Sequence, residues 1–447
     1  MSPSAVASVN KTDMASNLTE AGVKHTIKDT APSIAVNGHS TGLQELDASK
    51  ITFTPNENPK AVPEANSPEV TKMSSCTDHM ITATWTSKTG WTAPSLIPYG
   101  PLALQPHASV LHYSTSCFEG MKFYRGHDLK IRLFRPSLNT VRMLNSSARI
   151  SLPAFPPAEL QKLIETLVAV EGEKWLPKSR PGSFMYLRPT MIGTAPTLSV
   201  NKPNEVLLYI IACCFPDFND PAATLGAHAN ANNNESPNGN SETKPRPGLK
   251  LLASKEDTIR AWPGGFGFAK VGANYGPSLL ASDEAHLRGF NQILWLFGPD
   301  SEITEAGASN FFLVWKTREG RTQLVTAPLG DGIILAGVTR RSVLELARER
   351  IGGEELEVVE RKICMWELEE AVNEGRLMEA FAAGTAYFIM PISLIHYRGT
   401  DLHIPFADDN YGSKLKQWLM DIMYGAESHE WGVVVQERSL IPSDLDE

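Results

Sequence analysis

The amino-acid sequence predicts an α+β or mixed α/β protein with two ordered halves, at residues 73–218 and 248–447. Both halves contain segments with the two-residue alternation of strands and segments with the periodicity of helices. Between them, residues 219–247 contain seven Asn, four Pro and no aromatic residue. Such a composition is typical of a low-complexity linker, so this break separates two packed units.

The strands and helices of the first half can be placed from their apolar spacing. Residues 81–85 and 130–134 alternate as strands do. Leu160, Leu163 and Leu167 recur at helical spacing and predict a helix over residues 158–170. The uninterrupted apolar run at residues 206–215 predicts a buried strand.

The second half predicts further strands and two helices. Strands are expected at residues 249–253, 292–297 and 310–315. Helices are expected at residues 277–287 and 339–351, and Gly352-Gly353 ends the second of them. A strand–turn–strand unit is expected around Gly384-Thr385-Ala386, with strands at residues 380–381 and 387–390.

The N-terminal segment, residues 1–72, contains one aromatic residue, Phe53, and is rich in small and polar residues. We expect a mostly disordered tail, because so little apolar surface cannot offset the entropy of the chain. The segment has no apolar core of a secretory signal. The first arginine of the chain is Arg125, whereas mitochondrial presequences are rich in arginine, so a cytosolic location is favoured over a mitochondrial one.

Composition and charge argue against several classes of protein. A formal charge of −9 offers no basic surface for nucleic acid or an anionic membrane. The longest apolar run has ten residues, whereas a membrane-spanning helix needs about 20. The five cysteines are odd in number and lack CxxC spacing, which argues against a disulfide framework or structural zinc. We therefore expect a reducing compartment and no metal site.

One lysine, Lys270, stands among glycine and aromatic residues, in the segment Phe266-Gly-Phe-Ala-Lys-Val-Gly-Ala-Asn-Tyr-Gly-Pro277. The glycines fit neither a P-loop nor a dinucleotide-binding fingerprint, because no Gly-Lys-Ser/Thr closes them and Lys270 occupies the third glycine position. An exposed loop lysine is the ordinary interpretation. Close backbone approach by the glycines and the Tyr275 hydroxyl would also suit a Schiff-base lysine beside a planar cofactor.

The segment from Lys270 to Pro277 resembles the cofactor-lysine motif of the branched-chain amino acid aminotransferases, which are pyridoxal phosphate (PLP) enzymes of fold type IV. Similar motifs follow in family order between residues 77 and 431; they include Leu111-His-Tyr-Ser114, Phe118-Glu-Gly-Met-Lys122, Tyr186-Leu-Arg-Pro189, Gly337-Val-Thr-Arg340 and His429-Glu-Trp431. The resemblance is to the eukaryotic members. It implies a two-domain α+β fold, with a small α/β domain at residues 73–218 and a larger pseudo-barrel, PLP-binding domain at residues 248–447.

The resemblance also implies the catalytic and cofactor-binding residues. Lys270 would carry PLP and move the substrate's proton, Tyr275 would hydrogen-bond the cofactor's phenolic oxygen, and Glu305 would pair with its pyridine nitrogen. The phosphate ligands implied are Arg135, Val338, Thr339 and Thr385. Val338 and Thr339 open a predicted helix, whose N-terminal N–H groups favour an anion.

Substrate-binding residues are implied in the same way. Tyr113, Phe118 and Tyr186 would wall a pocket for aliphatic side chains, and Thr385 with Ala386 would face the substrate carboxylate. Arg188, together with Tyr113, resembles the family residue that holds the side-chain carboxylate of glutamate. Leu198 and Val200 resemble residues that reach over from a partner subunit, so a homodimer is expected. Core packing is the alternative explanation for each of the apolar residues.

The activity implied is transamination between branched-chain L-amino acids and 2-oxoglutarate. Two departures from the family pattern stand near the expected site, Cys76 in place of an aromatic pocket residue and Ala308 in place of a small hydroxyl residue. A paralogue acting on a related aliphatic or aromatic amino acid in a secondary pathway is therefore an alternative. A D-amino acid aminotransferase or an aminodeoxychorismate lyase is another, because both share the lysine and the glutamate.

Overall fold

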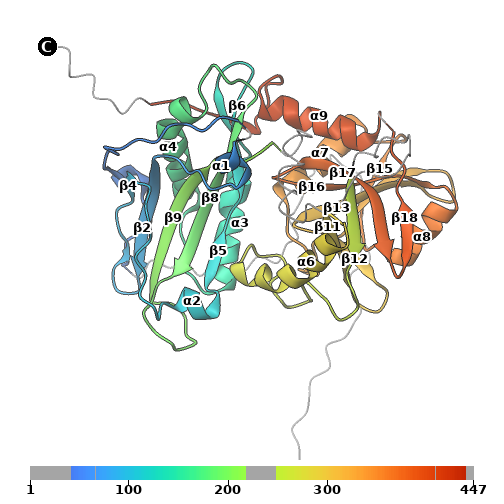
Figure 1. Cartoon of the computed structure of the whole chain (residues 1–447), viewed down its shortest axis with the longest axis horizontal. Coiled ribbons are helices and arrows are strands. Elements are labelled where there is room, and N and C mark those ends of the chain that lie inside the picture. The colour runs from blue at the N-terminus through green and yellow to red at the C-terminus, as the bar shows by residue number, and fades with distance from the viewer. Residues whose placement is uncertain (1–41, 66, 218–247, 408, 439–447) are drawn as a thin grey trace, which may run out of the picture. The chain divides into compact units, whose positions relative to one another are not determined.

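This computed structural model of the chain describes residues 42–65, 67–217, 248–407 and 409–438. The described residues form two β-sheets with helices packed on them, the first mostly blue to green and the second yellow to orange in Figure 1. No helix within those ranges is long and apolar enough to cross a membrane.

The first sheet has the strand order β1-β4-β2-β9-β8-β6-β7-β19, with β3 paired to β2 and β5 paired to β8. Its strands are β1 (Thr52–Phe53), β2 (His79–Thr86), β3 (Gly90–Trp91), β4 (Ser95–Pro98), β5 (Ser116–Phe118), β6 (Met121–Arg125), β7 (Ile131–Phe134), β8 (Phe184–Gly193), β9 (Glu205–Cys213) and β19 (Gly432–Val435). The pairings along this order are antiparallel except for β1 with β4. The strands expected at residues 81–85, 130–134 and 206–215 correspond to β2, β7 and β9.

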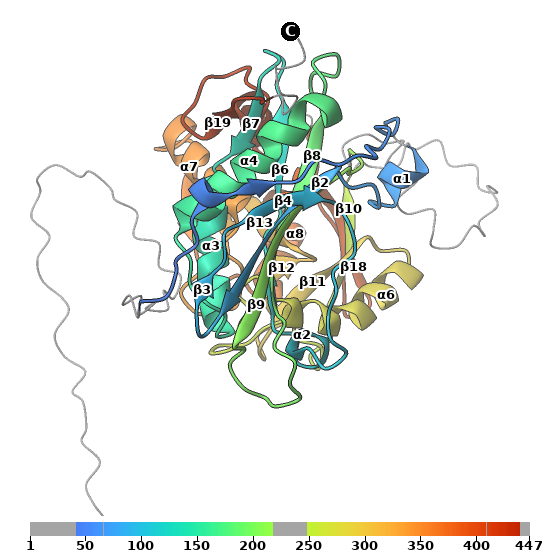
Figure 2. The same ribbon diagram turned by 90° about the vertical axis from the view of Figure 1, so that its left-hand side faces the viewer.

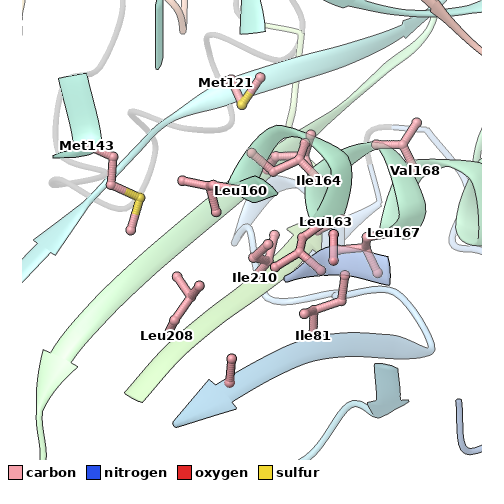
Figure 3. Close-up of a cluster of buried hydrophobic side chains, with 14 of the residues drawn as sticks. Ile81, Met121, Met143, Leu160, Leu163, Ile164, Leu167, Val168, Leu208 and Ile210 are labelled. Atoms are coloured by element: carbon pink, nitrogen blue, oxygen red, sulfur yellow. The ribbon is translucent and has the colours of Figure 1, made fainter. Parts of the chain in front are cut away.

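Helices α3 (Pro136–Arg149) and α4 (Pro157–Trp175) lie in the first half, with the short α1 (Pro68–Thr71) and α2 (Ser109–Tyr113). The helix expected at residues 158–170 is confirmed as α4. Its residues Leu160, Leu163 and Leu167 are fully buried. Figure 3 shows this face directed at Ile81, Leu208 and Ile210 on β2 and β9. The hydrophobic core of the first half therefore lies largely between the apolar face of α4 and one face of the first sheet.

The second sheet closes on itself. Its strands are β10 (Leu249–Ala253), β11 (Gln292–Phe297), β12 (Glu302–Ala306), β13 (Ser309–Lys316), β14 (Thr322–Thr326), β15 (Glu357–Glu360), β16 (Leu377–Gly384), β17 (Phe388–Tyr397) and β18 (Thr400–His403). Along the path β12-β11-β10-β17-β16-β13, an additional pairing of β12 with β13 closes a barrel of six of these described strands. The predicted α+β class with a larger barrel half is confirmed.

The helices of the second half are α6 (Leu279–Leu287), α7 (Val338–Arg350), α8 (Met365–Asn373) and α9 (Tyr411–Met423). The expected helix at residues 339–351 is confirmed as α7 to within one residue. The expected helix at residues 277–287 begins two residues later as α6, because residues 276–278 form a separate 3-10 turn.

The predicted N-terminal tail to residue 72 is corrected by the structure, because residues 42–65 and 67–72 are placed. Leu46 is 1% exposed and belongs to the buried cluster of the first half, together with Ala48. A few apolar residues can insert into a core that other segments build, which an average over 72 residues does not reveal. The predictions of a disordered tail at residues 1–41 and of a linker at residues 219–247 concern residues outside the described ranges.

The C-terminal strand changes the expected domain boundary. β19 pairs antiparallel with β7, so residues 432–435 belong to the first sheet although they follow the second half in sequence. Figure 2 shows β19, in dark red, beside β7. Beyond it, Glu437 makes a two-pronged ion pair with the fully buried Arg125, at 2.6 and 3.0 Å. Residues 248–447 are therefore not one separate unit.

The Leu46→Ala variant is expected to lose at least about 2 kcal/mol of the free energy of unfolding. The side chain is almost completely buried, so its removal leaves a cavity in the first core. Chemical denaturation followed by circular dichroism measures the loss. The matched control is Leu129→Ala, whose side chain is 42% exposed; an equal loss in the two variants would contradict the placement of residues 42–65.

Glu379 on β16 ties α9 to the barrel, and its charge is expected to make stability depend on pH. Its carboxylate accepts hydrogen bonds from the N–H groups of Tyr411 and Gly412, at the start of α9. Burial raises the pKa of Glu379 to about 7, although these two N–H groups act in the opposite direction. Since the folded-state pKa lies above the unfolded one, the contribution is present at low pH and is lost as pH rises through 7.

The Glu379→Gln variant should therefore lose less stability than the wild type between pH 5 and pH 8, by roughly 1–2 kcal/mol. Glutamine keeps an acceptor for α9 and carries no charge. Unfolding free energies at several pH values give the comparison. Parallel pH profiles would show that Glu379 does not titrate in this range.

Candidate active site

A cavity of about 470 Å³ lies between the two sheets and collects most of the residues that the sequence predicts for the site. The predicted residues that line it are Phe118, Tyr186, Arg188, Lys270, Tyr275, Val338, Thr339, Thr385 and Ala386. They come from β5, β8, the segment after β10, the start of α7 and the turn between β16 and β17. A larger hollow, of about 590 Å³, is lined by none of the predicted residues.

Lys270 is held by the first half of the chain although it follows the linker in sequence. Its N–H donates to Ser146 Oγ at 2.8 Å, and its carbonyl accepts from Phe118 N at 3.1 Å. The 3-10 turn at Gly272–Asn274 then brings Tyr275 back toward it, so that Lys270 Nζ donates to the Tyr275 hydroxyl at 3.0 Å. The alternative of an exposed loop lysine is thereby excluded, because the amine faces a cavity and has a hydroxyl partner.

Glu305 on β12 lies behind this cavity, in an adjoining hollow of about 110 Å³ that shares Tyr275, Ala308 and Asn310 as lining residues. The Glu305 carboxylate is 4% exposed and pairs with Arg260 Nη2 at 2.6 Å. It also accepts from Leu335 N at 2.9 Å. Burial raises the pKa of Glu305, and Arg260 partly offsets that effect. Arg260 is a partner that the sequence interpretation did not assign.

One end of the cavity is suited to an anion. Arg142 on α3 lines it beside Val338 and Thr339, and no side chain caps the N-terminus of α7 at Gly337. Arg142 is fixed by the buried Glu119, with Nε and Nη2 each 2.7 Å from a carboxylate oxygen. Uncapped helix N–H groups and a fixed guanidinium together form a site for a phosphate group.

Arg135, the predicted phosphate arginine, does not line this cavity. It is the residue before α3, pairs with Glu345 at 2.5 Å, and stacks on the Trp431 ring at 4.0 Å. Within the cavity, the arginine of this segment is Arg142, seven residues further along α3, and not Arg135. Arg142 reaches the chain just before α7, where its Nη1 donates to the Ala336 carbonyl at 3.0 Å.

The opposite wall carries an arginine among aromatic rings. Tyr186 and Arg188 are two residues apart on β8 and therefore face the same side of the sheet. The Arg188 guanidinium lies 4.7 Å from the Phe118 ring centroid and 5.2 Å from that of Tyr186. Its Nη2 donates to the Tyr186 hydroxyl at 3.2 Å, whereas its buried Nε has no hydrogen-bond partner among the described residues.

Tyr113, Leu198 and Val200 are not part of this cavity. The Tyr113 hydroxyl donates to the Leu198 carbonyl, so these two residues contact each other outside the cavity. Leu198 and Val200 are 61% and 81% exposed. Tyr113 and Arg188 were expected to hold the same carboxylate, but within one chain Arg188 lines the cavity and Tyr113 does not.

Lys122, which closes the quoted segment Phe118–Lys122, received no role from the sequence analysis, but it contacts a turn that lines the cavity. Its Nζ donates to the Ala386 carbonyl at 2.9 Å and lies 3.8 Å from the Phe184 ring centroid. Burial lowers the pKa of Lys122 to about 7. On the same turn, the Thr385 hydroxyl donates to the Gly120 carbonyl at 3.3 Å. Lys122 and Gly120 thus hold the turn from Gly384 to Ala386 against the first sheet.

The arrangement combines an amine, a phenol and a buried carboxylate with an anion site and a second arginine. The described residues contain no group of three or more metal-ligating side chains. An amine beside a hydroxyl, in a cavity lined by two arginines, favours covalent chemistry at an amine on a substrate or cofactor that carries negative groups at two places.

Comparison with known proteins places the chain in a family. The profile described as amino-transferase class IV matches residues 116–395, which span the cavity. The chain therefore belongs to the class IV aminotransferases.

Its curated relatives narrow this class. The chain is 40% identical over 397 residues to a mitochondrial branched-chain-amino-acid aminotransferase of Schizosaccharomyces pombe, covering 88% of this chain and 86% of that protein. It is 41% identical over 401 residues to a cytosolic one of Saccharomyces cerevisiae, covering 88% and 99%. It is 42% identical over 411 residues to one of Monosiga brevicollis, covering 91% and 95%. Within the family it belongs with the eukaryotic branched-chain amino acid aminotransferases.

Solved structures have the same fold at lower identity. The branched-chain amino acid aminotransferase of Escherichia coli has a TM-score of 0.57 and 22% identity, and the match covers 79% of this chain and 98% of that one. The PLP form of the enzyme from Thermobaculum terrenum gives the same values. The curated relatives include proteins named cytosolic and proteins named mitochondrial.

Proposed function

We propose that this chain transfers the amino group between branched-chain L-amino acids (leucine, isoleucine and valine) and 2-oxoglutarate, with PLP as cofactor. The products are branched-chain 2-oxo acids and L-glutamate. One observation carries the proposal: the cavity joins the Lys270 amine, the Tyr275 hydroxyl and the Arg188 guanidinium in a chain 40–42% identical to branched-chain aminotransferases.

The residues present fit PLP. Arg142 and the first N–H groups of α7 would hold the phosphate, with the Thr385 hydroxyl beside them. Glu305 would approach the ring nitrogen from the adjoining hollow, where its raised pKa suits a carboxyl that shares a proton. Ala308 lines both hollows and offers no hydroxyl there. The solved structure of the Thermobaculum terrenum enzyme in its PLP form supports the same cofactor.

The chain's own residues supply attachment, positioning and proton transfer. PLP, when bound, withdraws electrons from the substrate's Cα and so makes its proton removable. Lys270 Nζ would carry the cofactor and then take and return that proton as a general base. Tyr275, 3.0 Å from Nζ, would orient the amine. The N–H groups of the turn at Thr385 and Ala386, positioned by Lys122, would receive the substrate carboxylate.

One pocket would accept two unlike side chains because of Arg188. The neighbouring aromatic rings and the aliphatic stem of Arg188 offer surfaces for an apolar side chain. The unpaired Nε–H of Arg188 can bind the second carboxylate of glutamate. A buried carboxylate without such a partner would be costly.

We propose a homodimer in which Tyr113, Leu198 and Val200 of each copy complete the cavity of the other. Leu198 and Val200 are exposed, and none of the three residues lines the cavity of its own chain; this supports the proposal, since exposed apolar side chains of this size mark contact surfaces. Leu279, Leu280 and Leu287 of α6 are also more than 60% exposed. We further propose a cytosolic location, which rests on the absence of arginine before Arg125.

A panel of amino donors with 2-oxoglutarate tests the proposed reaction. The purified protein, loaded with PLP, is expected to convert leucine, isoleucine and valine to their 2-oxo acids with equal formation of glutamate. Aromatic amino acids and D-amino acids serve as comparisons. Preference for an aromatic or a D-amino acid would favour one of the alternative functions.

Replacing Arg142 is expected to weaken PLP binding more than replacing Arg135. The Glu119→Gln/Arg142→Met double variant should raise the Kd for PLP at least about 30-fold, because a charge-assisted contact to phosphate contributes about 2 kcal/mol or more. The Glu119 change prevents an unpaired buried carboxylate. Arg135→Met, the matched control, should leave the Kd nearly unchanged. Equilibrium dialysis of the apo-protein measures both, and the reverse order would restore the original assignment to Arg135.

A further inference from the structure

Two cysteines far apart in sequence face each other across an antiparallel bridge, Cys76 before β2 and Cys213 at the end of β9. The flanking hydrogen bonds run from Thr77 N to the Ala212 carbonyl, at 2.9 Å, and from Cys214 N to the Ser75 carbonyl, at 2.8 Å. This pattern makes Cys76 and Cys213 a non-hydrogen-bonded pair, whose Cα atoms are typically about 4.5 Å apart. That separation lies within the range of disulfides.

The surroundings of Cys76 favour its thiolate. The Cys213 and Tyr99 side chains lie beside it, and Lys60 Nζ is 3.4 Å from the Cys76 carbonyl, while the Cys213 thiol donates to the Met73 carbonyl at 3.1 Å. The Cys213 contact, with smaller effects of Tyr99 and Lys60, lowers the pKa of Cys76 to about 6 against the effect of burial. The same contact raises the pKa of Cys213, so the proton stays on Cys213.

The other cysteines lack this combination. Cys117 is completely buried, and burial raises its pKa. Burial also raises the pKa of Cys214, to about 11, and that of Cys364. A thiol with a lowered pKa, paired across an antiparallel bridge with a second cysteine, is therefore found at Cys76 and Cys213 alone among the five cysteines, all of which are described.

We propose that Cys76 and Cys213 form a reversible dithiol–disulfide site that is oxidised by hydrogen peroxide. The Cys76 thiolate, whose proton has passed to the solvent, attacks one peroxide oxygen and the O–O bond breaks. The hydroxide that leaves takes up a proton to become water, and Cys76 becomes a sulfenic acid. The Cys213 sulfur then attacks the Cys76 sulfur; the S–O bond breaks, and the hydroxyl group leaves as water with the Cys213 proton. In total two thiols and one peroxide give one disulfide and two waters, and a dithiol reductant reverses the change.

The site lies next to the candidate active site without being part of it. Cys213 is the register partner of Tyr186 on β8, so Cys76, Cys213 and Tyr186 form a row on one face of the first sheet. Tyr186 lines the cavity, and its ring stacks on Phe215 at 4.3 Å. Cys76 and Cys213 are 6% and 7% exposed, so only a small oxidant such as peroxide is expected to reach them. The inference does not depend on the proposed function.

Peptide mapping tests the proposal on the full chain with PLP bound. Reduced protein is treated with hydrogen peroxide, remaining thiols are alkylated, and the digest is analysed without reduction. We expect the Cys76–Cys213 linked peptide as the main product, loss of two free thiols per chain, and full recovery after dithiothreitol. Cys76 should be consumed at least about tenfold faster than Cys364.

Two variants sharpen the result. In Cys213→Ser, one thiol should be lost and Cys76 should be trapped by dimedone as sulfenic acid. In the matched control Cys364→Ser, the linked peptide should form as in the wild type. A linked peptide of other composition, equal consumption of the five cysteines, or intact thiols at Cys76 and Cys213 after Cys364 has reacted would each overturn the proposal. The wild-type mapping decides the question even if a variant fails to fold.

Discussion

Lys270→Ala is expected to abolish transamination, with a fall in kcat of at least about 10³-fold. The residue would supply both the amine that carries the cofactor and the base that moves the substrate's proton. Its Nζ contacts the Tyr275 hydroxyl and a cavity, so its removal leaves no buried charge unpaired. Turnover of leucine with 2-oxoglutarate measures the loss, and circular dichroism shows whether the fold is kept.

The matched control is Lys255→Ala, which removes an exposed lysine paired with Glu284 on the second half of the chain. It should retain wild-type turnover and the yellow colour of bound cofactor. If Lys270→Ala turned over leucine at a rate close to that of the wild type, the assignment of this residue would be wrong.

Arg188→Met is expected to separate the two substrates of the reaction. Methionine roughly keeps the volume of the side chain and removes the charge. The half-reaction with glutamate should lose about 2–4 kcal/mol of transition-state binding, which corresponds to about 30- to 1,000-fold in kcat/KM. The half-reaction with leucine should lose much less, because its side chain needs only the apolar surfaces of Phe118 and Tyr186.

Single-turnover rates with each amino donor, followed by cofactor absorbance, give the two losses separately. Arg180→Met is the matched control, since Arg180 is partly exposed and contacts Glu64 and the Pro63 carbonyl outside the cavity. It should leave both half-reactions unchanged. Equal losses for leucine and glutamate in Arg188→Met would mean that Arg188 supports the structure or the cofactor and does not select the substrate.

The strands and helices that were predicted correctly share one property: their apolar pattern lies within the segment itself. α4 and α7 carry buried residues at helical spacing, and β10 and β11 are short, mostly apolar segments. For these elements, burial of one face decides the structure locally. The strand β19 was missed because its four residues acquire a partner only when the chain returns to β7.

The site residues divide in the same way. Motif resemblance led to Lys270, Tyr275 and Arg188, and the structure brings these three into one cavity. It also led to Arg135, which pairs with Glu345 outside the cavity, whereas Arg142 on the same segment lines it. It gave no role to Lys122, whose partner, the Ala386 carbonyl, lies 264 residues away.

The sequence by itself therefore determined the family and the α+β class, and its motifs singled out Lys270. These features depend on residue types a few positions apart, and such patterns can be recognised in the sequence without the structure. Only the tertiary structure decided that the barrel closes through β12 and β13, that residues 42–65 enter the first core, that Arg142 faces the anion site, and that Cys76 meets Cys213. The contacts of residues 42–65, of Arg142 and of the two cysteines join segments far apart along the chain, so they are fixed only when packing brings those segments together. β12 and β13 are neighbours in sequence, but their pairing closes a barrel only because the distant strands β10, β17 and β16 complete the path between them.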